Sequence, residues 1–291
     1  MSLAPLLPIE IVACDSLQVY AGMDIGTGKP TEAERRLVPH HLLDVVSPAE
    51  AFHAARWAAL ARAAVHDVVA RGRVPVIVGG TGLYLRALLG GLFEAPPPDE
   101  AIRQRHRDEA AQGGVESVHA RLAAIDPETA GRVKTRDLVR ISRALEVFEQ
   151  TGEAISTLRQ RAGVAVDVVA STVVLDPPLA SLRTFISARF DAMMAAGFLD
   201  ETRRLRSLYG AGARPLGGLG YKQLGAHLDG ALSLADAVTA GKAATAAYAR
   251  RQRTWFRQDR AAWRVAEAPA PAAIVDWWRR GGVVDGFATT P

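Results

Sequence analysis

Two short apolar runs, each followed at once by polar or glycine residues, constrain the fold of this chain most. Residues 9–14 read Ile-Glu-Ile-Val-Ala-Cys and precede Asp15, and residues 74–78 read Val-Pro-Val-Ile-Val and precede a glycine pair. Apolar, β-branched runs of this length are typical of buried strands. An Ala-rich stretch with helical spacing lies between them at 54–70, and residues 83–89 also read as a helix. This order predicts a parallel sheet covered by helices.

The middle of the chain has a different character. Residues 100–160 are rich in charge and helical by pattern, whereas the apolar run at 171–175 predicts that the sheet resumes there. We therefore expect an α/β core formed by residues 1–110 and 166–291, with a helical insertion over 111–165. Further helices are predicted over 185–208, with a possible break near Gly197, and over 235–263, and the last 25 residues are expected to add little.

Composition limits the class of protein without naming it. The chain has 291 residues, of which 49% are hydrophobic, so it can bury a core of one large domain or two small ones. A net charge of +4 permits a polyanionic partner but does not demand one. Cys14 is the one cysteine, which rules out an intrachain disulfide and fits a reducing compartment. No apolar stretch approaches the ~20 residues of a membrane span, and no signal peptide is visible, so we expect a cytoplasmic protein.

Four motifs follow one another along the chain. They are Asp-Ser-Leu-Gln-Val-Tyr at 15–20, Gly-Thr-Gly-Lys-Pro-Thr at 26–31, Gly-Gly-Thr-Gly-Leu-Tyr at 79–84 and Arg-Arg-Gln-Arg-Thr-Trp-Phe at 250–256. In this order they resemble the bacterial tRNA dimethylallyltransferases, over residues 9 to 263 or so. The resemblance implies a P-loop-type parallel sheet with flanking helices and a helical insertion domain. It also implies transfer of a dimethylallyl group from dimethylallyl diphosphate to the exocyclic amine of the adenine 3′ of the tRNA anticodon.

Asp15 is the candidate general base. It directly follows the first expected strand, and side chains at the carboxyl ends of parallel strands lie at the usual ligand edge of a sheet. The alternative is that Asp15 caps the following helix, which is the better reading of an isolated Asp-Ser pair. The whole six-residue motif, in register with the other motifs, favours the base. By resemblance, Asp15 takes a proton from the adenine amine and Thr81 lines the channel where adenine and prenyl donor meet.

The Gly-Thr-Gly-Lys motif at 26–29 does not form a P-loop. The pattern G-x-x-x-x-G-K-[ST] needs Gly at position 23 and Ser or Thr at position 30, where this chain has Met23 and Pro30. We expect this motif to shape the region next to Tyr20. The resemblance implies a separate phosphate-binding loop about twenty residues before Asp15, whereas fourteen residues precede Asp15 here. The first strand and the P-loop are therefore expected to be absent, through a start codon placed too late or, less favoured, a real truncation.

Basic residues concentrate late in the chain. Between positions 241 and 264 there are seven Lys or Arg against one acid, a net charge of +6. A stripe so one-sided repels itself unless an anion lies on it. Trp255 and Phe256 interleave with it and either stack on a base or anchor the helix to the core. Arg140 and Arg143 share one helix face, where they grip RNA phosphates or pair with Asp137 and Glu146.

The resemblance assigns the remaining site residues. The tRNA anticodon stem-loop is expected to contact Asp15, Ser16, Leu17, Gln18, Arg103, Val139, Arg140, Ile141, Ser142, Arg143, Gly220, Tyr221, Lys222, Arg250, Arg251, Gln252, Arg253, Thr254, Trp255 and Arg257. Arg189 is expected to bind the diphosphate. Histidine spacing gives no protein-built metal site, and Mg²⁺ is expected to arrive with the diphosphate. The protein is expected to act as a monomer.

Two alternatives stay open at this point. One is a prenyltransferase that acts on free adenine nucleotides, which would need neither the insertion nor the basic helix. The other is a catalytically impaired remnant that only binds tRNA.

Overall fold

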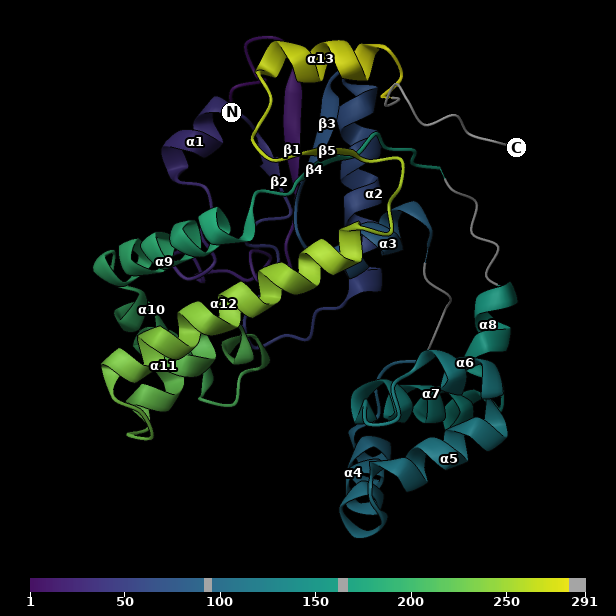
Figure 1. The fold of residues 1–291 in the computed structure, drawn as a ribbon. Helices are drawn as coiled ribbons and strands as arrows, with labels where there is room; N and C mark the ends of the chain where they lie inside the picture. The colour runs from purple at the N-terminus through teal and green to yellow at the C-terminus, as the bar shows by residue number, and fades with distance from the viewer. Residues whose placement is uncertain (92–95, 162–166, 283–291) are drawn as a thin grey trace. The chain divides into compact units, whose positions relative to one another are not determined.

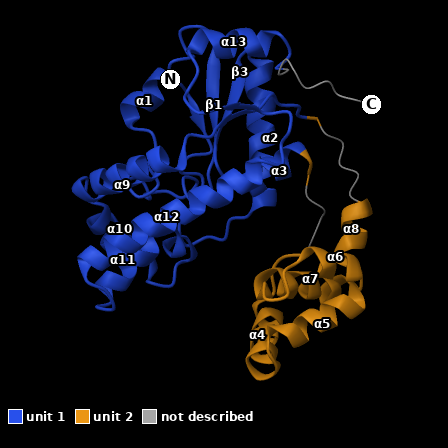
Figure 2. Cartoon of the chain, viewed as in Figure 1, with its two compact units in different colours: residues 1–89, 168–291 blue, residues 90–167 orange. Residues whose placement is uncertain are grey.

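The computed structural model describes residues 1–91, 96–161 and 167–282. The chain divides into two compact units, which Figure 2 colours separately. The first unit comprises Met1–Leu89 with Val168–Pro291, and the second comprises Gly90–Asp167.

A three-stranded parallel sheet lies at the centre of the first unit. Strand β1 (Ile9–Cys14) pairs with β3 (Val74–Gly79) on one side and with the short β2 (His40–His41) on the other. Ile9 is opposite Val74 and Cys14 is opposite Gly79, so β1 and β3 end at the same level. The parallel pair predicted from the sequence is thus confirmed. The pattern missed β2, because two histidines form no apolar run.

Helix α2 (Ala54–Ala70) packs on this sheet through an apolar stripe that includes Ala58, Ala61 and Val65. Trp57 in this stripe is fully buried, and its Nε1 donates a hydrogen bond of 3.1 Å to the carbonyl of Ala13 in β1. The Trp57 ring also stacks on that of Tyr84, with 5.0 Å between centroids. These contacts connect α2 to both the sheet and α3 (Gly82–Leu89).

A second, two-stranded sheet replaces the expected continuation of the first. Among the described residues, β4 (Val173–Leu175) pairs in parallel with β5 (Trp263–Val265) and not with β1 or β3. The helix predicted over 235–263 therefore ends early: α12 covers Leu234–Phe256. The Arg264 guanidinium donates to the carbonyls of Phe256 and Asp259 after the helix end, which favours the turn into β5.

The last part of the chain adds more structure than expected. Helix α13 (Pro271–Arg279) begins with a proline at its first turn, which suits the fixed φ angle of that residue. Its Trp277 is buried and packs against Trp263 of β5, with 5.3 Å between ring centroids. This apolar contact packs α13 against β5.

Helices α3, α9 and α11 pack against α12, which Figure 1 shows as a long diagonal helix reaching from α11 toward α3. Helices α9 and α10 separate at Gly197, whose φ of +99° suits glycine, so the predicted break is confirmed.

No helix in the described ranges is both long enough and apolar enough to cross a membrane. The bounds are α1 Glu32–Leu37, α9 Leu179–Ala195, α10 Phe198–Tyr209, η1 Arg214–Gly217 and α11 Tyr221–Leu228.

The second unit is helical throughout its described residues. Its helices are α4 Glu100–Gly113, α5 Val115–Ile125, α6 Pro127–Arg132, α7 Leu138–Thr151 and α8 Ile155–Arg161. Val118, Leu122, Ile141 and Leu145 form its core. The unit begins at 90 and not at the expected 111, because α4 packs on α5 and α7. The buried His106 of α4 fixes this packing through Ser142 and Glu149 of α7, each 2.9 Å away.

Candidate active site

Asp15 and Thr81 follow the ends of neighbouring strands. Because β1 and β3 end at the same level, the residues after them meet at the carboxyl edge of the sheet. The amide of Ser16 donates to the Thr81 hydroxyl oxygen at 3.1 Å, and the amide of Thr81 donates to the carbonyl of Cys14 at 3.2 Å. The sheet therefore brings the two expected catalytic residues into one site.

The Asp15 carboxylate shapes the turn that follows it. Its Oδ1 accepts hydrogen bonds from the amides of Leu17, at 2.8 Å, and Gln18, at 3.2 Å. The capping alternative is thus partly right, although the capped segment is a turn and not a helix. No hydrogen bond to the second oxygen, Oδ2, occurs within the described residues, and the side chain is only half-buried. The same residue can therefore hold the turn with one oxygen and accept a proton with the other.

Cys14 lies beneath this turn. Its thiol donates a weak hydrogen bond to the carbonyl of Thr81, with 3.7 Å between sulfur and oxygen. Burial, with a further contribution from the charge of Asp15, raises the pKa of the Cys14 thiol to about 12. At neutral pH the thiol is protonated and does not act as a nucleophile.

Helix α12 covers the glycine-rich turn after β3. The Gln252 amide donates to the carbonyl of Gly80 at 3.0 Å, and a Cβ added at Gly80 would lie 1.9 Å from that nitrogen. A Cβ at Gly82 would lie 2.1 Å from Nε1 of Trp255. Both glycines are needed because the helix approaches so closely. The Arg86 guanidinium lies over the Trp255 ring, 4.1 Å from its centroid. Of the two roles expected for Trp255, stacking on a base or anchoring the helix, these contacts show the anchoring role.

Tyr248 is a site residue that the sequence motifs did not reveal. Burial raises its pKa, and the negative charge of Asp15 raises it further, while hydrogen bonds with Thr81 and Gln252 oppose the shift. Tyr248 of α12 thus lies near enough to Asp15 and Thr81 for both to affect its pKa. A signal was available: Tyr248 precedes Gln252 by four positions and Trp255 by seven, which puts the three on one helix face.

A buried carboxylate holds the loop that carries the Gly-Thr-Gly-Lys motif. Glu201 of α10 accepts hydrogen bonds from the amides of Asp24 and Ile25, at 2.8 Å each, and of Gly26, at 3.0 Å. The Tyr221 hydroxyl donates to it as well, at 2.6 Å. Four donors on one carboxylate compensate its burial. Tyr221, expected to contact tRNA, is instead fully buried as part of this arrangement, whereas Lys222 beside it is exposed.

The lysine of this motif is a structural residue. The Lys29 side chain is 1% exposed, and its Nζ lies 2.6 Å from the carbonyl of Tyr20, 2.9 Å from Asp24 Oδ1 and 2.5 Å from Asp44 Oδ1. An ammonium has three donors, and all three are used here. The geometry agrees with the interpretation that this block is not a phosphate-binding loop. The loop in turn accepts the Gln18 amide at the carbonyls of Thr27, 3.2 Å, and Gly28, 3.4 Å.

Arg189, the expected diphosphate ligand, lies at another cavity. It lines a cavity of about 830 Å³ together with Lys29, Pro30 and Met193. Its guanidinium lies over Gly28, where an added Cβ would be 2.2 Å from Nη2. No described contact joins Arg189 to Asp15 or Thr81.

The arginines of α12 differ in their surroundings. Arg253 forms an ion pair with Asp176 and is largely buried, so its charge is directed into the protein. Arg251 lies over the Tyr248 ring, 5.5 Å from its centroid. Arg250 and Arg257 are exposed. The Thr254 hydroxyl donates to the carbonyl of Arg250 within the helix.

Most residues of the second unit that were expected to contact RNA are buried or form ion pairs within the unit. The fully buried Glu146 accepts from Arg103 at 3.0 Å and from Arg143 at 2.6 Å, and Arg140 pairs with Asp137. Both ion pairs of the alternative interpretation are therefore present. Ile141 and Ser142 are buried in the core, whereas Val139 is 81% exposed. Only Val139 and Arg140 of this segment present exposed side chains.

The described residues do not offer Mg²⁺ a site of their own. No three His, Cys, Asp or Glu side chains among them lie close enough together to hold a metal ion. Asp24 and Asp44 both bind the ammonium of Lys29. An ion that arrives with a diphosphate needs fewer protein ligands.

Comparison with known proteins shows the family to which this chain belongs. Residues 18–259 match the model of the family described as IPP transferase, and the chain belongs to that family. A protein of Anaeromyxobacter dehalogenans (strain 2CP-C), named tRNA dimethylallyltransferase, is 46% identical over 94% of this chain and 92% of its own length. A protein of the same name from Anaeromyxobacter sp. (strain Fw109-5) is 49% identical over 89% of this chain and 87% of its own length.

Solved structures similar to this chain agree with its membership of the family. The tRNA isopentenylpyrophosphate transferase of Bacillus halodurans is 32% identical, with a TM-score of 0.66, and the match covers 96% of this chain and 90% of that one. A eukaryotic dimethylallyltransferase acting on tRNA is 25% identical, with a TM-score of 0.70, over 88% of this chain and 65% of that one.

The Glu201 arrangement leads to a stability prediction. Glu201→Gln keeps the shape of the side chain but turns an amide donor toward backbone donors. We expect the free energy of unfolding of the first unit to fall by about 3 kcal/mol, as for buried donors left without acceptors. Urea denaturation followed by circular dichroism measures it. Asp200→Asn, at the exposed neighbouring residue, is the control and should change little. Equal effects of both changes would show that the loop does not depend on Glu201.

Proposed function

We propose that this protein is a tRNA dimethylallyltransferase, which transfers a dimethylallyl group from dimethylallyl diphosphate to the exocyclic amine of the adenine 3′ of the anticodon in tRNA. The observation that carries the proposal is the meeting of Asp15 and Thr81 at one sheet edge, joined through the 3.1 Å bond from the Ser16 amide to the Thr81 hydroxyl. The match of residues 18–259 to the IPP transferase family supports it.

In the proposed reaction the amine nitrogen attacks the first carbon of the prenyl group. A nitrogen–carbon bond forms, the bond from that carbon to the diphosphate oxygen breaks, and the diphosphate leaves with the bonding electrons. The amine loses one proton, which Oδ2 of Asp15 accepts. The Thr81 hydroxyl and the Tyr248 phenol orient the adenine. A base in a tRNA loop reaches such a site by leaving its stack.

We further propose that the first unit has a P-loop-type architecture and that Mg²⁺ accompanies the diphosphate. We also propose that the protein acts as a cytoplasmic monomer and that its second unit binds tRNA. Arg140 and Val139 are the residues of that unit's segment 139–143 that we expect to approach RNA, since they are exposed. A free adenine nucleotide is the less favoured substrate, because it would use neither the second unit nor the exposed arginines of α12.

The general base is tested by Asp15→Asn. We expect RNA affinity to stay the same and the transfer rate to fall by about 10² to 10⁴, the usual contribution of a positioned base. Thr81→Ala should lose less, because a hydroxyl there only orients the amine. Single-turnover transfer from radiolabelled donor measures the rate, and a filter-binding assay measures affinity. Weaker RNA binding at an unchanged rate would make Asp15 a binding residue.

Tyr248→Phe tests the residue found from the structure. It removes the phenol whose pKa responds to Thr81 and Asp15, and it keeps the ring under Arg251. We expect kcat to fall about tenfold, the loss of one neutral hydrogen bond, with little change in KM for RNA. Tyr209→Phe, at a residue of α10 distant in sequence from these motifs, is the matched control. If both variants transfer at the wild-type rate, Tyr248 has only a packing role.

The basic helix is tested through salt. Neutralising a phosphate releases counterions, so affinity for an anticodon stem-loop should fall steeply as salt rises. Arg257→Ala should weaken binding of all tRNAs alike and reduce the slope of log K against log salt by roughly 0.7 to 0.9. Arg132→Ala, at an arginine that pairs with Glu128 at 2.9 Å, should do less. Binding that responds neither to salt nor to Arg257 would favour the nucleotide substrate.

A further inference from the structure

Gln252 of α12 directs its side chain at the glycine-rich turn after β3, although it was expected to contact tRNA. Its Nε2 donates a hydrogen bond of 3.0 Å to the carbonyl of Gly80. If Gly80 carried a Cβ, the three nearest atoms would all belong to the Gln252 carboxamide, with Nε2 at 1.9 Å, Cδ at 2.9 Å and Oε1 at 3.6 Å. The carboxamide therefore lies directly on this turn.

The peptide group between Gly80 and Thr81 is held at both of its polar atoms. Gln252 donates to its carbonyl oxygen, and its N–H donates to the carbonyl of Cys14 at 3.2 Å. Because a peptide group is planar, fixing these two atoms fixes the direction in which the chain enters Thr81. The Thr81 hydroxyl in turn accepts the amide of Ser16, next to the candidate base, at 3.1 Å. The contact made by Gln252 thus bears on where this hydroxyl lies.

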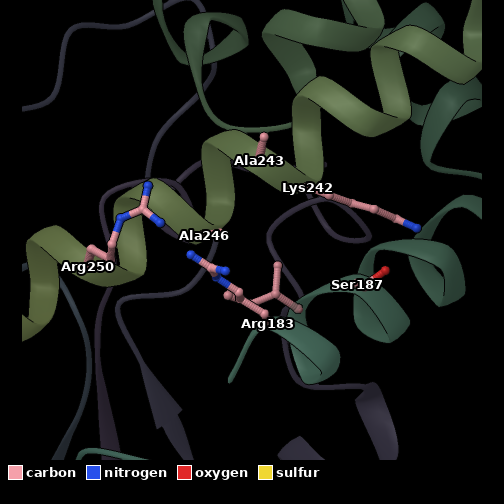
Figure 3. A pocket seen from close by; sticks show the side chains of 7 residues that line it. Arg183, Ser187, Lys242, Ala243, Ala246 and Arg250 are labelled. Atoms are coloured by element: carbon pink, nitrogen blue, oxygen red, sulfur yellow. The ribbon is translucent and has the colours of Figure 1, made fainter. Parts of the chain in front are cut away.

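Gln252 does not belong to the basic face of α12. On that face Lys242, Ala246 and Arg250 follow one another at intervals of four. With α9 they line a cavity of about 330 Å³, here called the basic cavity, which Figure 3 shows. Gln252 lies two positions after Arg250, about 200° around a helix of 3.6 residues per turn. Its half-buried side chain therefore points to the other side, toward the sheet.

Two successive glycines in this turn are required for different reasons. A Cβ at Gly79 would lie 2.2 Å from the backbone oxygen of Cys14, so this glycine permits the close pairing of β3 with β1. Gly80 has no φ angle in the left-handed region, and the nearest obstacle to a Cβ there is the side chain of Gln252. The glycine at position 80 thus serves the contact with Gln252.

We propose that Gln252 is a positioning residue of the candidate active site: by holding the carbonyl of Gly80, it orients the peptide group that precedes Thr81 and so places the Thr81 hydroxyl beside Asp15. Gln252 touches neither the RNA nor the donor in this role. Its effect on the transfer rate rests on the proposed function, whereas its hold on the turn does not.

The first test separates positioning from RNA binding. Gln252→Met keeps the length of the side chain and removes the donor. We expect the single-turnover transfer rate at saturating RNA to fall about tenfold, the loss of one neutral hydrogen bond, with unchanged RNA affinity in a filter-binding assay. Gln258→Met, at an exposed glutamine just after α12, is the matched control and should change neither quantity. Weaker RNA binding at an unchanged saturated rate would make Gln252 an RNA contact and overturn the proposal.

The second test asks whether Gln252 acts through Thr81. In a Thr81→Ala background the hydroxyl is gone, so adding Gln252→Met should slow transfer by no more than about twofold, the scatter of independent effects. A further tenfold loss in that background would show that Gln252 only packs the helix. Gly80→Ala should slow transfer in the wild type by displacing Gln252, but should have no further effect in a Gln252→Ala background. Equal losses from Gly80→Ala in both backgrounds would contradict the proposal.

The third test needs neither RNA nor donor. Amide hydrogen exchange at Thr81, followed by NMR on the full chain, reports how often its N–H leaves the carbonyl of Cys14. Gln252→Met and Gln252→Ala should each speed this exchange about tenfold, and Gln258→Met should not, while thermal unfolding checks that each variant is folded. Unchanged exchange at Thr81 would show that Gln252 does not hold the turn. A wild-type chain that transfers no prenyl group would overturn the proposed function, and the exchange measurement would still decide the role of Gln252.

Discussion

The carboxylate of Glu201 is the interaction on which the geometry of the site depends. It comes from α10, far along the chain, and accepts the amides of three successive loop residues, Asp24 to Gly26. The side-chain amide of Gln18 donates to two carbonyls of this loop, and the backbone amide of Gln18 donates to Oδ1 of Asp15. A chain of hydrogen bonds thus runs from a buried helix residue to the candidate base. Such a series orients its last member more strictly than the strand end alone would.

The site also depends on how closely α12 approaches the sheet. Gly80 and Gly82 leave no space for side chains, so Gln252 and Trp255 contact the turn directly. One face of α12 closes the candidate active site, and the other lines the basic cavity. Movements of this helix would therefore affect both places together.

Much of this could be predicted from the sequence, and the exceptions have physical reasons. The runs at 9–14 and 74–78 identified the parallel pair because buried strands need continuous apolar sequence. The motifs at 15–20 and 79–84 identified Asp15 and Thr81, the residues that meet at the sheet edge. The role of Glu201 was not predictable, because its partners are backbone amides 175 to 177 positions away and carry no residue signature. Likewise, β5 was missed, and its first residue, Trp263, was included in the predicted helix, because three residues are too few to show a period of two.

The burial of Cys14 has a practical consequence. Its thiol lies under the Thr81 turn and stays protonated at neutral pH, while the rest of the sequence contains no other cysteine. Reagents that modify thiolates should therefore leave the wild-type surface unmarked. A single cysteine introduced at an exposed position, such as one on α7 or α12, would be the sole site of attachment for a fluorophore or spin label. The protein is thus suited to distance measurements between its two units in solution without prior removal of a native thiol.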